Sequence, residues 1–256
     1  MCPVDKFRLS AVPPARAERS EAGGGTGQAG EAKFIVERRM SRTAKLLVGM
    51  MGAMMLAGQA AHAETSAGKQ GLLALDSPAP DFHLPDVVSE KVVSLADVAD
   101  QQALLVMFIC RHCPYVQHVK HALAQLARDY QGKPLGIIAI SANDPADYPA
   151  DAPDSLKAMA QEEGFLFPVC YDESQRVAKV YTAVCTPDFF LFNQARRLVY
   201  RGQFDDSRPG NRKPVTGRDV RAASDAVLDG LPVAQDQKPS FGCSIKWKPG
   251  NEPSNR

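Results

Sequence analysis

The sequence predicts an α/β fold with a central mixed sheet flanked by helices and an extended C-terminal tail. Short apolar runs typical of buried strands alternate with segments of helical periodicity, as in largely parallel sheets with helices on both faces. Two late apolar runs, at residues 189–192 and 198–204, predict a hairpin that adds antiparallel strands. A Cys-x-x-Cys motif at residues 110–113 lies where a predicted strand ends and a predicted helix begins.

The first 63 residues are expected to lie outside the mature protein. Residues 1–39 are rich in Ala, Gly, Arg and Glu without apolar periodicity, which is typical of disordered or non-native upstream sequence. Residues 40–63 combine a positively charged start, the apolar run LLVGMMGAMMLAG and an A-x-A cleavage site. This run is shorter than the roughly 20 residues that a bilayer span requires, so the segment is predicted to be a secretory signal peptide.

The signal peptide implies export to the periplasm or cell envelope, an oxidising compartment in which disulfides persist. Without residues 1–63 the chain carries 21 basic and 24 acidic residues and no basic cluster, so nucleic-acid binding is not expected. The mature chain also contains no apolar segment that predicts a membrane span and no phosphate-binding glycine loop. We therefore expect no cofactor, no nucleic-acid partner and no membrane span in the mature chain.

The first half of the predicted domain surrounds the cysteine motif. KVVSL at 91–95 reads as a short strand, and ALLVMFI at 103–109 is aliphatic enough to be a buried one. Apolar residues recur with helical spacing over 115–130, and Gly132 and Pro134 are expected to end that helix.

The second half continues the alternation of strands and helices and ends in a hairpin and a last helix. Asp154 or Ser155 is expected to cap the second helix. The domain is predicted to cover 77–234, between a linker at 64–76 and a tail at 235–256. The remaining strands are expected at 135–140, 165–170, 188–192 and 197–204, and the remaining helices at 156–163, 175–181 and 220–231.

The cysteine motif predicts reversible thiol–disulfide exchange. The N-terminus of a helix stabilises a thiolate through its free N–H groups and partial positive charge, and the thiolate is the reactive species. We expect Cys110 to be the nucleophile, because it is predicted to be the more exposed thiol, and Cys113 to be the resolving partner. Arg111 and His112 can both be positive and are expected to favour the thiolate by Coulomb attraction.

A metal site is the alternative interpretation of the same spacing. Half of a zinc site also reads Cys-x-x-Cys, but no second pair follows at zinc-finger distance. His118 and His121 lie further along the predicted helix and keep open a copper chaperone that would use Cys110, Cys113 and a His. We assign no residue of the chain as a metal ligand.

Four segments in the expected order resemble the thioredoxin superfamily. They are APDF at 79–82, FICRHCPY at 108–115, CTPDFFLF at 185–192 and YRGQFDD at 200–206. They look most like the redoxin branch, in the peroxiredoxin-like group of exported redoxins with a Cys-x-His-Cys-Pro-Tyr motif. The resemblance covers about 77–232 and implies a thioredoxin-like fold.

The resemblance also implies roles for residues outside the motif. Pro187 would be a cis-proline facing the cysteines, and Thr186 would offer backbone hydrogen bonds to an extended substrate peptide. In a peroxiredoxin-like thiol peroxidase, which is the alternative function, Cys113 would be the peroxidatic cysteine. The acid that thioredoxin buries before its motif is replaced here by Leu104.

The mature chain holds five cysteines, so at least one is unpaired or bonds between molecules. Cys170 ends an apolar run and is expected to be the buried, unpaired one. In a thioredoxin-like fold Cys185 would lie near the active-site loop, where Cys243 of the tail can reach it. We predict a Cys185–Cys243 disulfide that staples the tail or relays electrons, and that closes a loop of roughly 60 residues worth about 4 kcal/mol.

The function that these observations predict is an exported thiol–disulfide oxidoreductase. It would act on protein thiols or disulfides through the Cys110–Cys113 couple, together with an unidentified redox partner. With His112 and Arg111 between the cysteines, the couple is expected to be more oxidising than that of thioredoxin.

Overall fold

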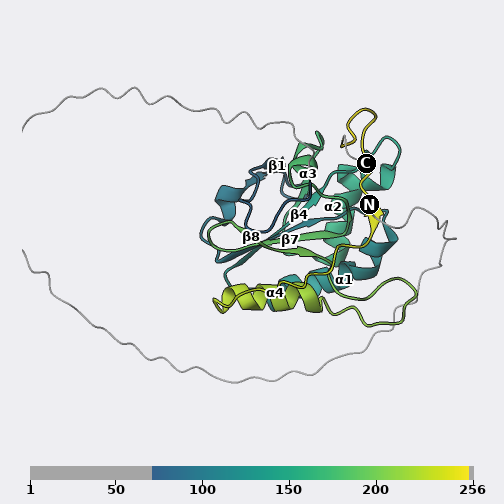
Figure 1. The fold of residues 1–256 in the computed structure, drawn as a ribbon. Coiled ribbons are helices and arrows are strands. Elements are labelled where there is room, and N and C mark those ends of the chain that lie inside the picture. The colour runs from purple at the N-terminus through teal and green to yellow at the C-terminus, as the bar shows by residue number, and fades with distance from the viewer. Residues whose placement is uncertain (1–70, 254–256) are drawn as a thin grey trace, which may run out of the picture. The chain divides into compact units, whose positions relative to one another are not determined.

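The computed structural model describes residues 71–253, coloured in Figure 1. The upstream segment, the signal peptide and most of the linker predicted above lie outside the described residues and stay predictions. None of the described helices has the length and apolar composition that crossing a membrane requires.

A five-stranded mixed sheet in the order β5-β4-β3-β7-β8 forms the centre of the domain. The apolar runs of the sequence form its inner strands because residues of β3 are buried on both faces. β7 runs antiparallel to β3 and β8, so the predicted mixed sheet and late hairpin are confirmed. Its parallel strands are β3 (Ala103–Phe108), β4 (Leu135–Ser141) and β5 (Val169–Tyr171), and the hairpin is β7 (Asp188–Phe192) with β8 (Leu198–Gly202).

Two smaller antiparallel pairs flank this sheet. The strands β1 (His83–Pro85) and β2 (Val92–Ser94) form one pair. The other pair joins β6 (Cys185–Thr186) to β9 (Cys243–Ser244), a strand of the C-terminal tail. The C-terminal tail therefore packs against the domain through this strand pair.

Helices cover both faces of the sheet, as Figure 1 shows for α1 and α4 on one side and α3 on the other. Side chains of β3 alternate between two cores, with Leu105 facing α1, α2 and α4 and Leu104 facing α3. The helices are α1 (Pro114–Asp129), α2 (Pro153–Glu163), α3 (Arg176–Val180) and α4 (Arg218–Leu228), with the 3-10 helices η1 (Leu95–Val98) and η2 (Pro149–Asp151).

Two local predictions were wrong. Helix α2 begins at Pro153, which suits the first helical position, so Ala152 is the N-cap and neither Asp154 nor Ser155 caps it. The strand expected over 165–170 is reduced to β5, which begins only at Val169. Proline at position 168 has no N–H to donate to a neighbouring strand.

Candidate functional site

The cysteine motif lies between the end of β3 and the start of α1, as predicted. Helix α1 begins at Pro114, so Cys113 is its N-cap residue and Cys110 precedes the helix. Both cysteines are 0% exposed. The expectation that Cys110 is the more exposed thiol was therefore wrong.

Thr186 contacts both sulfur atoms of the motif. The Cys110 Sγ lies 3.2 Å from the Thr186 hydroxyl, and the Cys113 thiol donates to the Thr186 carbonyl over 3.1 Å. The peptide bond between Thr186 and Pro187 is cis. The structure thus brings Thr186 and the motif cysteines together, and the role of Thr186 and Pro187 in substrate binding stays a prediction.

The two thiols have opposite pKa shifts. Burial raises the pKa of Cys110, and the neighbouring Cys113 and the Asp151 carboxylate raise it further. Burial alone would also raise the pKa of Cys113. Hydrogen bonds to the Cys113 sulfur outweigh burial and the effect of the Thr186 carbonyl, and they hold the pKa of Cys113 well below its ordinary value. The donors are the Cys110 thiol, the thiol and amide of Cys243, and the Val116 amide. The surroundings of Cys113 therefore favour the thiolate form more than those of Cys110 do.

Asp151, a fully buried carboxylate, holds the motif loop in place. Its Oδ1 accepts the backbone amides of Arg111 (2.7 Å) and His112 (2.9 Å). Its Oδ2 accepts from Asn143 Nδ2 (2.8 Å) and contacts the His112 ring nitrogen Nδ1. Burial alone would raise the pKa of Asp151, but the hydrogen bonds from His112 and Asn143 prevail and lower it.

Asp151 and Asn143 were not predicted as site residues, although their positions in the sequence indicate where they lie. Both lie in the polar segment that follows β4, and β4 runs parallel to β3. The carboxyl ends of neighbouring parallel strands meet at one edge of a sheet, so polar residues after β4 are expected beside a motif after β3.

The two residues between the cysteines point in different directions. Arg111 donates its guanidinium to the Ser155 carbonyl (2.5 Å) and to Glu162 (3.2 Å), so it faces α2 rather than the sulfurs. His112 stacks on Tyr148 with ring centroids 4.7 Å apart, and its Nδ1 lies 3.8 Å from the Cys110 Sγ. The geometry thus places His112, and not Arg111, beside a motif thiol.

The tail strand β9 brings a third cysteine to the site. Cys243 pairs with Thr186, and Ser244 pairs with Cys185. Directly opposed residues of an antiparallel pair face the same side, so Cys243 faces the motif and Cys185 faces away from it. None of the described cysteines forms a disulfide, so the predicted Cys185–Cys243 bond is not formed in this structure.

One cluster of the described residues has the composition of a metal site. Ligand atoms of Cys110, His112 and Asp151 lie within 4.8 Å of one another. The histidines that the copper alternative considered lie elsewhere, since His118 contacts Ser207 and His121 pairs with Glu163. A metal ion at the motif would therefore bind through Cys110, His112 and Asp151.

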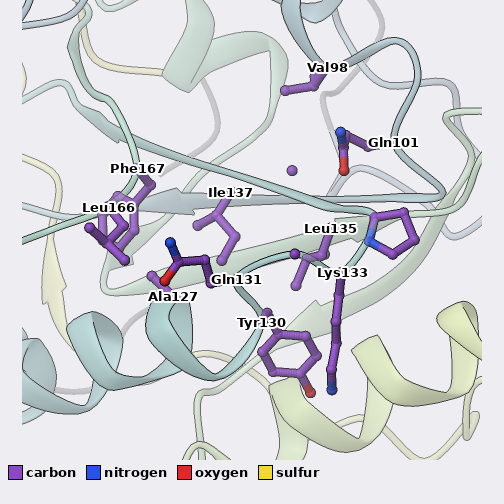
Figure 2. A pocket seen from close by; sticks show the side chains of 13 residues that line it. Val98, Gln101, Ala127, Tyr130, Gln131, Lys133, Leu135, Ile137, Leu166 and Phe167 are labelled. Atoms are coloured by element: carbon purple, nitrogen blue, oxygen red, sulfur yellow. The ribbon is translucent and has the colours of Figure 1, made fainter. Parts of the chain in front are cut away.

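The pocket drawn in Figure 2 is far from the cysteines. It has a volume of about 670 Å³ and lies at the other end of α1, a helix about 24 Å long, where Tyr130, Lys133 and Leu135 line it (Figure 2). Beside the motif, the tail residue Phe241 and Pro187 help to line a cavity of only about 10 Å³, close to the least volume that holds one water. This cavity is therefore too small to hold more than about one water.

Cys170 lies in β5 and is 0% exposed. Burial, with a smaller effect of Asp86, raises the pKa of Cys170 to about 12. We expect this thiol to stay unmodified by iodoacetamide at pH 8 and to react once guanidinium unfolds the chain, because the neutral buried thiol is a poor nucleophile. Peptide mass spectrometry measures this, and rapid labelling of the native protein would contradict the prediction.

The comparisons with known proteins agree with this architecture. The AhpC/TSA family matches residues 75–201, whereas no curated protein matches the chain. An uncharacterized conserved protein from Geobacillus kaustophilus is 52% identical, with a TM-score of 0.68 over 70% of this chain and 95% of that one. A hypothetical protein from Sinorhizobium meliloti 1021 is 49% identical, with a TM-score of 0.69 over 70% of this chain and 98% of that one. The chain belongs to the AhpC/TSA family, in the redoxin branch of the thioredoxin superfamily.

Proposed function

We propose that this protein is an exported thiol–disulfide oxidoreductase that cycles Cys110 and Cys113 between dithiol and disulfide and acts on protein thiols or disulfides. The observation that carries the proposal is the placement of both motif sulfurs against Thr186 at the N-terminus of α1, in surroundings that favour the Cys113 thiolate. Attack of this thiolate on a disulfide forms a mixed disulfide, which the second thiol resolves. Export rests on the signal peptide predicted at residues 40–63.

The hydrogen bonds favour Cys113 as the attacking thiolate, which reverses the roles expected from the sequence. Cys110 then resolves the mixed disulfide and must first lose its proton. His112, whose Nδ1 lies 3.8 Å from the Cys110 Sγ and also contacts Asp151, is placed to accept that proton. His112 takes the place of the buried acid that Leu104 replaces.

The activity is tested by insulin reduction and by oxidative refolding of a scrambled protein, and a wild-type protein that catalyses neither would refute it. The roles are tested with glutathione disulfide, in a background of Cys243→Ser so that no third thiol can resolve. Adding Cys110→Ser is expected to leave glutathione bound to Cys113, whereas adding Cys113→Ser leaves Cys110 largely unmodified. Peptide mass spectrometry locates the adduct, and its accumulation on Cys110 instead would restore the original assignment.

A thiol peroxidase is the second candidate, because a thiolate at a helix N-terminus also suits attack on peroxide. The Cys113 thiolate would attack one oxygen of hydrogen peroxide, the O–O bond would break, and the other oxygen would leave as water. Condensation of the resulting sulfenic acid with the Cys110 thiol would give the disulfide and a second water. Consumption of hydrogen peroxide with a thiol donor, abolished by Cys113→Ser, would support this activity.

A further inference from the structure

The C-terminal tail is fixed across the cysteine motif by contacts along its length. The Phe241 ring packs against Tyr115 with centroids 5.3 Å apart, and Ile245 is buried in the core that contains α3. The Lys246 amide donates to Asn143 Oδ1 over 2.9 Å. Gly242 passes so close that a Cβ there would lie 2.0 Å from the Thr186 carbonyl oxygen. Cys243 is therefore held at one position relative to the motif.

Cys243 is the outermost of three neighbouring thiols. Cys110 and Cys113 have no exposed surface, whereas Cys243 is partly exposed. Thiol–disulfide exchange requires a thiolate to reach a sulfur atom. A protein dithiol can therefore approach Cys243 more readily than the motif cysteines while the tail stays in place.

Cys243 is also within bonding reach of Cys113. The Cys113 thiol donates to the Thr186 carbonyl, and Thr186 is the β-ladder partner of Cys243. The thiol and the amide of Cys243 both hydrogen-bond to the Cys113 sulfur. Two thiols in direct contact form a disulfide by small rotations of their side chains.

We propose that Cys243 is a third redox thiol, which forms a disulfide with Cys113 and connects the buried pair to a protein dithiol outside. The inference rests on the proposed function, since it requires a Cys110–Cys113 disulfide. It replaces the predicted Cys185–Cys243 bond, because β9 directs the Cys243 side chain toward the motif.

The transfer of the disulfide from Cys110–Cys113 to Cys113–Cys243 requires no added oxidant. The Cys243 thiolate attacks the Cys113 sulfur of the Cys110–Cys113 disulfide, the new sulfur–sulfur bond forms, and the electron pair leaves on Cys110, which takes up the proton that Cys243 lost. An external dithiol then attacks Cys243 and releases Cys113. Its second thiol resolves the mixed disulfide, so two electrons and two protons end on Cys113 and Cys243.

The bond itself is tested in the Cys110→Ser variant, treated with glutathione disulfide and mapped under non-reducing conditions. We expect a linked Cys113–Cys243 peptide pair and no retained glutathione. The Cys110→Ser, Cys243→Ser double variant is the matched control and is expected to retain glutathione on Cys113. Recovery of Cys243 as a thiol with glutathione still on Cys113 in the single variant would overturn the inference.

The connecting role is tested by reducing the oxidised protein with a thioredoxin and with dithiothreitol. We expect Cys243→Ser to slow reduction by thioredoxin about tenfold and reduction by the small reagent much less, because serine keeps the tail in place but removes the thiol of the least buried cysteine of the three. Cys170→Ser, which alters a thiol outside the site, is expected to change neither rate. An unchanged rate with thioredoxin in Cys243→Ser would refute this role.

The two proposals fail in different ways. If wild type and Cys243→Ser both form the Cys110–Cys113 disulfide but Cys110→Ser forms no Cys113–Cys243 bond, the oxidoreductase proposal stands and the third thiol is refuted. If the Cys110–Cys113 disulfide forms in neither protein, the proposed function fails and the inference that rests on it fails too.

Discussion

Replacing Asp151 by alanine is expected to destabilise the protein by about 3–5 kcal/mol, a large part of the about 5–15 kcal/mol that stabilises a typical domain. The substitution leaves the amides of Arg111 and His112 and the side-chain amide of Asn143 without their buried acceptor. Urea unfolding followed by circular dichroism measures the loss. Asp154→Asn, a change at an exposed carboxylate nearby, is the control and is expected to cost little.

The same carboxylate predicts an acid-dependent loss of stability. The pKa of Asp151 is lower in the folded chain than in the unfolded chain, so its contribution is complete above the unfolded pKa of about 3.9 and is lost as the pH falls through the folded value. Asp151→Asn keeps the size of the side chain but does not titrate. Its free energy of unfolding should therefore depend less on pH between about 5 and 2 than that of wild type, and parallel curves would contradict this assignment.

Changing Gly242 to alanine is expected to displace the tail and expose Cys113. The added methyl group would overlap the Thr186 carbonyl, which belongs to the backbone and cannot rotate away. Overpacking of this kind costs about 1–3 kcal/mol, and 1.4 kcal/mol already changes an opening equilibrium about tenfold. Iodoacetamide should therefore modify Cys113 about tenfold faster at high pH, where the thiol is ionised in both proteins.

The pH dependence of this reaction separates displacement of the tail from general unfolding. Loss of the Cys243 hydrogen bonds removes part of what lowers the Cys113 pKa, so the midpoint of the rate profile should move to higher pH in Gly242→Ala. Cys170 should remain unmodified, since the core is intact. Gly71→Ala is the matched control, because a Cβ at that position has no neighbour within 4 Å. An unchanged profile in Gly242→Ala would show that the tail does not shield Cys113.

Local patterns in the sequence predict the sheet, because apolar runs and helical spacing report directly on burial. They identify β3, β4, β7 and α1 within one or two residues, and they place the motif between β3 and α1. They fail over 165–170, where apolar composition alone predicts a strand. The proline at 168 has no N–H for backbone pairing with a neighbouring strand, and β5 begins only after it.

The site is less predictable because distant segments complete it. Cys110 is buried beside Thr186 and Asp151, which lie far from it in the sequence, so its exposure cannot be inferred from its position before a helix. The direction of the Arg111 side chain depends on Glu162 in α2, and the partner of Cys243 depends on the register of β9 against β6. Each of these contacts spans dozens of residues, whereas apolar periodicity reports only on a residue's neighbours in the chain.

Asn143 gives the tail and the motif a common support. Its amide nitrogen donates to Asp151, and its amide oxygen accepts from the Lys246 backbone. Both hydrogen bonds depend on one orientation of the buried Asn143 side chain. Docking of the tail and ordering of the motif loop are therefore thermodynamically coupled. Reciprocity then applies: to the extent that oxidation of the motif weakens tail docking, docking of the tail disfavours the oxidised motif by the same factor. The reduction potential of the cysteine pair is thereby tied to the position of a strand that begins 130 residues after the motif ends.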